Sequence, residues 1–176
     1  MKGIYLASYK ANHPNYEIVY QDINGKRDIG GDMMDVDLSQ YDYIIATPPC
    51  NWWSRANYRR DKSPYALQTK HLLIDIINKL TSQEKPFIVE NVKNDKQFSI
   101  HGLMDIPNIH VYKIGRHTYW SNIYFDTSSI IQKPLVEIRN GKRIWLSSQQ
   151  LPRNKRQGGK EVHEVIERFL EVIHEN

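Results

Sequence analysis

The stretch YDYIIATPPCNWWS (residues 41–54) decides how this chain can fold. Its first half is apolar and rich in aromatic and branched residues, which is typical of a buried strand, and two prolines then end the strand. Pro48 and Pro49 each fix φ and restrict the residue before them, so the backbone leading to Cys50 has little freedom. A lone cysteine is most often an inert buried residue, but such a stiff approach also suits a nucleophile that must be aimed.

The quoted stretch and the segment after it together predict a strand, a helix and a second strand. Ser63 and Pro64 are a helix start, with an N-cap and a proline at the first helical position, and apolar residues recur at helical spacing as far as Leu80. PFIVEN (residues 86–91) then reads as a strand. A helix between two strands implies parallel neighbours, so Cys50 and Glu90 should face one crevice at the carboxyl edge of the sheet.

Glu90 follows three apolar residues, where desolvation raises a carboxyl pKa toward a useful acid–base range. A solvated or capping carboxylate is the alternative. For Cys50, nearby cations such as Arg55 or Arg59 would favour the reactive thiolate.

Further strands are expected at residues 3–8, 16–21, 109–114, 122–127 and 142–147. A C-terminal amphipathic helix should bury Val165, Phe169 and Ile173, with its glutamates mostly on the opposite face. The pattern predicts one α/β domain over residues 1–176 with a mostly parallel, doubly wound sheet.

Composition sets the broad class. The chain has 176 residues, 40% apolar and 25% charged, and contains no apolar run long enough to cross a membrane. We expect no secretory leader, and a single cysteine favours a reducing, cytoplasmic setting. No metal site is predicted.

Positive charge is concentrated in two places. Residues 139–160 carry seven Lys or Arg and no acid, and a smaller basic cluster lies between residues 55 and 62. Basic segments interleaved with Trp, Tyr, Asn and Gln suit a nucleic acid, although a solvated loop face is the usual reading of any single charged run.

ATPPCNWWS resembles the Pro-Cys motif of the DNA cytosine-5 methyltransferases, and PFIVENV resembles their Glu-Asn-Val motif at a suitable distance. Upstream, GGDMMDVDLSQYDYII is similar to their Gly-Asp-Ile segment. The resemblance covers about residues 30–92 and suggests a compact, phage-like member. It implies the Rossmann-like fold of methyltransferases that use S-adenosylmethionine.

The resemblance also implies a mechanism. Cys50 would attack carbon 6 of a cytosine in DNA, Glu90 would engage ring N3, and carbon 5 would take the methyl group. The base must leave a duplex or belong to a single strand. Residues 51–62 would close over it, with the tryptophans as stacking faces or, alternatively, as core anchors. The expected nucleic-acid contacts are Asn51, Trp52, Trp53, Ser54, Arg55, Arg59, Arg60, Arg153, Lys155 and Arg156.

Elsewhere the likeness is thinner. Arg116 is the candidate for a family arginine that contacts the flipped base, and His117 is a weaker candidate for a general base. Residues 126–150 are a possible reduced target-recognition segment. The glycine-rich turn of the family's cofactor site is missing, which leaves Asp22, Asp32 and Pro48 as the expected cofactor contacts.

Two further possibilities follow from the missing turn. A partner subunit could complete the cofactor site. Alternatively, the chain could be a catalytically inactive relative that binds nucleic acid or a partner protein.

Overall fold

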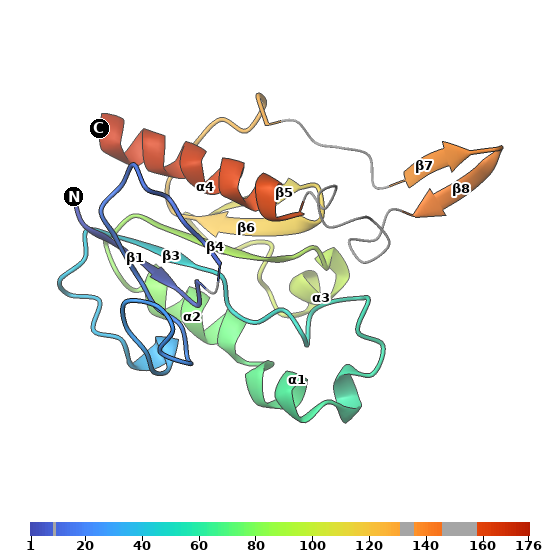
Figure 1. Ribbon diagram of the computed structural model, residues 1–176, viewed down its shortest axis with the longest axis horizontal. Helices are drawn as coiled ribbons and strands as arrows, with labels where there is room; N and C mark the ends of the chain where they lie inside the picture. Colours follow the sequence, from blue (N-terminus) through green and yellow to red (C-terminus); the bar gives the residue numbers. More distant parts are fainter. Residues whose placement is uncertain (9, 131–135, 146–157) are drawn as a thin grey trace.

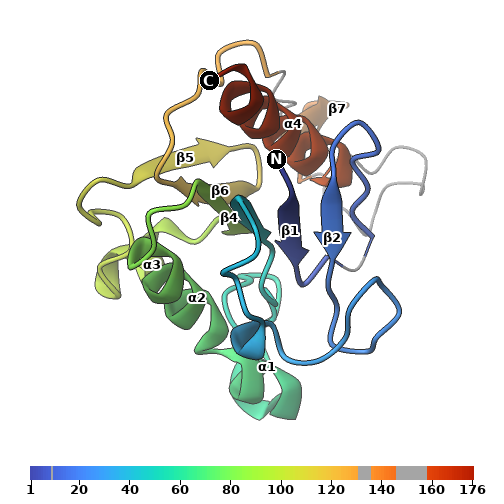
Figure 2. The ribbon, with the colours of Figure 1, turned by 90° about the vertical axis from the view of Figure 1, so that its left-hand side faces the viewer.

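The computed structural model describes residues 1–8, 10–130, 136–145 and 158–176. A six-stranded sheet with the order β2-β1-β3-β4-β6-β5 forms its centre (Figures 1 and 2). Four strands are parallel: β1 (Gly3–Leu6), β2 (Ile18–Tyr20), β3 (Tyr43–Ala46) and β4 (Phe87–Val92). β6 (His117–Ser121) runs antiparallel to β4, and β5 (His110–Ile114) forms the edge. The predicted mostly parallel α/β fold is therefore confirmed.

Helices cover both faces of the sheet (Figure 2). α2 (Leu72–Thr81) packs on one face with a core that includes Ile44, Val89 and Trp120. α4 (Gly158–Glu175) packs on the other with Tyr43, Ile88 and Tyr119. Because successive strand residues point to opposite faces, β3 and β4 supply both cores.

The predicted helix of residues 63–80 is two helices, α1 (Pro64–Thr69) and α2. The predicted start is confirmed, since the Ser63 hydroxyl accepts a hydrogen bond from the Ala66 N–H at 3.3 Å. The chain turns after Thr69, whose hydroxyl donates to the Tyr65 carbonyl at 2.8 Å, a contact that competes with helical bonding. Leu67 of α1 is 40% exposed.

The predicted strand at residues 122–127 is wrong, and β6 ends just before it. Asn122 ends the strand because its side chain accepts from the Phe87 N–H and donates to the Lys85 carbonyl. Those bonds occupy the start of β4 that a longer β6 would have paired with.

Besides β6, a helix and one strand of a hairpin lie outside the predictions. α3 (Asp95–Ile100) follows β4, and β7 (Val136–Arg139) pairs with β8 (Lys142–Trp145), where the sequence predicts one strand. The β7–β8 hairpin projects from the body of the protein (Figure 1). No helix among the described residues is long and apolar enough to cross a membrane.

The connection between β1 and β2 is short, and its described residues form no helix. Ala7 begins it with φ of 56°, a left-handed conformation that costs an alanine about 1–2 kcal/mol. The chain thus makes without glycine the sharp turn that follows the first strand.

Candidate active site

A pocket of about 970 Å³ lies where the parallel strands end. Residues directly after three of the four parallel strands line it: Ala7 after β1, Gln21 after β2 and Thr47 after β3. Open α/β sheets bind ligands at this edge, beside the point where the strand order reverses. Here β1 lies between β2 and β3, so the pocket occupies that point.

Cys50 and Glu90 both line this pocket. β3 and β4 are parallel neighbours, with Ala46 opposite Val89, so the predicted convergence of the two residues is confirmed. Cys50 is partly buried, and the side chain of Glu90 is 14% exposed. A thiol and a carboxyl group can therefore act on one small substrate.

The local charges do not favour the thiolate. Burial raises the pKa of the Cys50 thiol, and the Glu90 carboxylate raises this pKa further. The expectation that Arg55 or Arg59 would lower it is wrong, because Arg55 lines a second pocket and Arg59 lies over the exposed ring of Tyr58. The neutral thiol of Cys50 therefore persists to higher pH than that of a free cysteine.

Glu90 lies in a row of three ionisable side chains, Glu90, His117 and Glu161, that the sequence did not predict. His117 Nε2 lies 3.6 Å from the Glu90 carboxylate, and His117 Nδ1 lies 3.1 Å from that of Glu161. Burial raises the pKa of Glu90, His117 opposes this rise, and Glu161 adds to it. Burial lowers the pKa of His117, but its two carboxylate partners outweigh burial, so this pKa is raised. Glu90 thus stays neutral, and His117 stays cationic, to higher pH than the free side chains would.

Gly115 makes room for this arrangement in the tight turn between β5 and β6. Its φ is 54°, and a Cβ atom at this position would overlap the Glu161 carboxylate. Glycine therefore avoids the cost of a left-handed backbone, and a side chain here would have to displace the Glu161 carboxylate.

Arg116, the predicted catalytic arginine, lies in the same turn and does not line the pocket. Its carbonyl accepts a hydrogen bond from the Lys93 N–H. The cationic side chain that reaches Glu90 is that of His117, one residue further on, because alternate strand residues face opposite sides of the sheet.

The predicted DNA-facing loop, residues 51–62, is anchored by its second tryptophan. Trp53 is 1% exposed and packs against Phe98 and His101, so it cannot stack on a base, and its alternative role as a core anchor is confirmed. Trp52 is half-buried, with Arg60 and Lys70 within about 6 Å of its ring. Ser54 donates its N–H to the Cys50 carbonyl.

Two asparagines hold this segment in place: Asn91, which belongs to the Glu-Asn-Val motif, and Asn94, to which the sequence assigned no role. Asn91 donates to the Pro48 carbonyl at 3.1 Å, and Asn94 donates to the Trp53 carbonyl at 2.6 Å. Both side chains are buried, so these bonds are shielded from water. The Pro-Pro-Cys segment is thereby fastened to the end of β4.

The predicted cofactor contacts Asp22, Asp32 and Pro48 all line the same pocket. Asp22 is 4% exposed, and its Oδ1 accepts hydrogen bonds from the N–H groups of Lys26 and Arg27. Its Oδ2 is buried without a partner among the described residues. A buried acceptor without a partner is costly, so this atom fits a ligand that brings a hydroxyl or amine donor.

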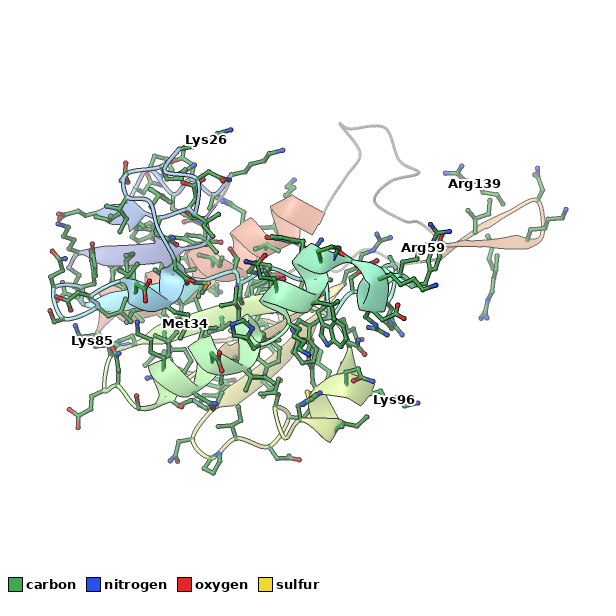
Figure 3. All side chains as sticks on the ribbon, turned by 90° about the horizontal axis from the view of Figure 1, so that it is seen from below. Lys26, Met34, Arg59, Lys85, Lys96 and Arg139 are labelled. Carbon is green, nitrogen blue, oxygen red and sulfur yellow. The ribbon has the colours of Figure 1, made fainter. Side chains whose placement is uncertain are left out.

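A second, polar pocket of about 370 Å³ is lined by several basic side chains. Arg55 and Arg60 come from the loop, and Lys93 and Lys96 follow β4; Asp95 is the one acidic group in the lining. Arg59 and Lys96 lie toward the same end of the protein (Figure 3). Asn51 lines the larger pocket instead. The predicted contacts Arg153, Lys155 and Arg156 lie outside the described residues.

These features have counterparts in known proteins. Residues 5–121 match the family model described as C-5 cytosine-specific DNA methylase. The chain is also 33% identical over 87 residues to Type II methyltransferase M1.HgaI of Avibacterium volantium, a match that covers 48% of this chain and 24% of the relative.

The chain belongs to the C-5 cytosine-specific DNA methylase family. It matches only about a quarter of the length of the curated relative.

Proposed function

We propose that this protein transfers a methyl group from S-adenosylmethionine to carbon 5 of cytosine in DNA. The observation that carries the proposal is the convergence of Cys50 and Glu90 on one pocket from neighbouring parallel strands. Membership of the family supports the reaction class. The direct test is transfer of a labelled methyl group to cytosine-containing DNA, which Cys50→Ala should abolish.

The proposed chemistry divides between the two residues. Cys50, once deprotonated, attacks carbon 6 of the cytosine, and neutral Glu90 donates a hydrogen bond or proton to ring N3 as charge develops there. The raised pKa of Glu90 supports this role, because it keeps the acid neutral toward higher pH. Removal of the carbon 5 proton and breaking of the bond from sulfur to carbon 6 complete the cycle and restore Cys50.

The pocket supports a bound cofactor. S-adenosylmethionine would supply the methyl group. Asp22 would accept a donor of the cofactor through its unpartnered Oδ2, and Asp32 and Pro48 would line the same site. A pocket of about 970 Å³ is at the upper end of the range for ligand sites and leaves room for a base as well.

Asp22→Asn should weaken binding of S-adenosylmethionine about tenfold or more. The carboxylate Oδ2 that would accept a hydrogen bond from the cofactor is replaced by an NH₂ group, which faces the cofactor's donor and cannot accept from it. The amide can still accept from Lys26 and Arg27, so the local turn should persist. Calorimetric titration with S-adenosylmethionine and S-adenosylhomocysteine measures the effect. Asp37→Asn, which changes an exposed aspartate with a similar backbone contact, is the control. Equal affinities for the three proteins would contradict the assignment.

The second pocket supports a DNA contact through its positive charge. Arg55 and Lys96 are exposed and come from two different segments that line it, so Arg55→Glu with Lys96→Glu should weaken DNA binding at low salt. Each lost phosphate contact lowers the slope of log affinity against log salt by about 1.

Lys26→Glu is the matched control, since Lys26 is exposed at the opposite end of the protein (Figure 3). Titration of a fluorescent duplex at several salt concentrations measures affinity and slope together. Unchanged slopes in the double variant would place the DNA elsewhere.

We further propose that residues 1–176 act as one methyltransferase-like domain in the cytoplasm, where a free catalytic thiol stays reduced. Residues 126–150 would recognise the target. Their described part supports this, because the hairpin projects from the protein, and Arg139, Lys142 and Arg143 are exposed (Figures 1 and 3). A two-stranded ribbon fits the major groove of DNA.

The raised pKa of Cys50 favours a second candidate, a catalytically inactive relative that binds DNA or a partner chain. A partner that completes the cofactor site would reconcile the two candidates. In that case this chain alone would bind DNA without methylating it, and addition of the partner would restore methylation.

A further inference from the structure

Three side chains with metal-ligating atoms meet at the edge of the large pocket. His13 Nδ1 lies 2.5 Å from Glu167 Oε1, and His163 Nε2 lies 3.6 Å from the same oxygen. The ligand atoms of the three residues all lie within 4.8 Å of one another. His13 belongs to the connection between β1 and β2, whereas His163 and Glu167 belong to α4.

The surrounding structure holds these residues in place. His13 is 2% exposed, its N–H donates to the Tyr20 hydroxyl at 2.7 Å, and its ring stacks on Tyr5. His163 and Glu167 are four residues apart, a spacing that puts two helical side chains on one face. Helical pairs at this spacing are a recurrent element of metal sites.

We propose that His13, His163 and Glu167 bind a divalent transition-metal ion, for which Zn²⁺ is the best fit. Two imidazoles and one carboxylate are a donor set that zinc accepts, and they leave a fourth position for water or another ligand. His13 and His163 line the pocket, so the proposed site adjoins it. The proposal is independent of the methyl-transfer reaction, and it adds a site where the sequence predicted none.

Binding requires a defined rearrangement. The His13 and His163 rings are stacked 4.4 Å apart and inclined by 6°, so one ion cannot lie in the planes of both. His163 is 47% exposed and can turn out of the stack, whereas His13 is held in place. In a tetrahedral zinc site the ligand atoms are about 3.4 Å apart. The 3.6 Å pair is already close to that value, and the 2.5 Å pair lengthens when the ion replaces the shared proton.

The bound ion would link the β1–β2 connection to α4. These two elements carry the residues that close this side of the pocket, and the connection has no helix of its own among its described residues. Because the ligands come together only in the folded chain, metal binding should stabilise the fold.

Titration of the full chain with Zn²⁺ tests the proposal. We expect saturable binding of one ion in calorimetry and a thermal midpoint that rises with zinc concentration. The imidazole NMR signals of His13 and His163 should shift together. His163→Ala and Glu167→Gln should each weaken binding at least about tenfold, since even outer partners of metal ligands contribute that much.

Two controls separate this site from adventitious binding. His71→Ala removes the histidine of another exposed pair four residues apart, His71 with Asp75 at 3.9 Å, and should leave zinc affinity unchanged. Cys50→Ser removes the thiol and should also leave it unchanged. Absence of saturable binding, full affinity in His163→Ala, or loss of affinity in either control would overturn the proposal.

Discussion

Replacing Cys50 by alanine is expected to abolish covalent capture of DNA that contains 5-fluorocytosine. In the proposed reaction the thiolate forms a bond to carbon 6, and the adduct normally breaks down after the carbon 5 proton leaves. Fluorine at carbon 5 cannot be removed as a cation, so the methylated adduct persists. Incubation with S-adenosylmethionine followed by denaturing electrophoresis should show a DNA-linked band for the native protein. Alanine offers no nucleophile, so its band should fall by at least about a thousandfold.

The control is DNA binding by the same variant. Cys50 is only partly buried, so truncation to alanine should leave the fold and DNA affinity close to those of the native chain. Cys50→Ser should also fail to trap, because a hydroxyl is a far weaker nucleophile than a thiolate. If the native protein binds the fluorinated DNA and cofactor but forms no adduct, the inactive DNA-binding alternative is favoured. Adduct formation by Cys50→Ala would assign the nucleophile to another residue.

The sequence predicted the four parallel strands because each is a short apolar run with clear turn signals at its ends. It failed where side chains, not apolar periodicity, decided the boundaries. Helical spacing continues through Thr69, but α1 ends there, where the Thr69 hydroxyl donates to the Tyr65 carbonyl. Asn122 likewise ends β6 through contacts with Phe87 and Lys85, more than thirty residues away. The bonds of Asn122 are long-range, and such bonds leave no mark on local periodicity.

The same distinction applies to the candidate site. The sequence alone predicted that Cys50 and Glu90 lie close together, because parallel strands align their carboxyl ends. The pairing of His117 with Glu161 could not be predicted from the sequence, since it depends on where the first turn of α4 lies against the β5–β6 turn. The glutamates of α4 suggested a solvated face, yet Glu161 is 15% exposed and directed at His117. Gly115 carried a signal for this close approach, but a turn alone explains a glycine equally well.

Glu90→Gln should lower the rate of methylation by about a hundredfold to ten-thousandfold, the usual range for loss of a general acid. It should also change the pH profile. In the proposed mechanism the native protein needs the Cys50 thiolate, which forms as pH rises, and neutral Glu90, which is lost as pH rises through its elevated pKa. The expected profile of kcat/KM is therefore a bell. Glutamine stays neutral at every pH, so in the variant the fall at high pH should disappear and the rate should follow the thiolate alone.

His117→Asn distinguishes the acid from its neighbour. Asparagine removes the cation beside Glu90 but keeps the carboxyl group, so the fall at high pH should remain. The loss of that cation should raise the pKa of Glu90, because His117 acts to lower it in the native protein. Initial rates measured across pH with saturating cofactor give both profiles. If the fall at high pH survives in Glu90→Gln and vanishes in His117→Asn, the proton comes from His117, and the role assigned to Glu90 is wrong.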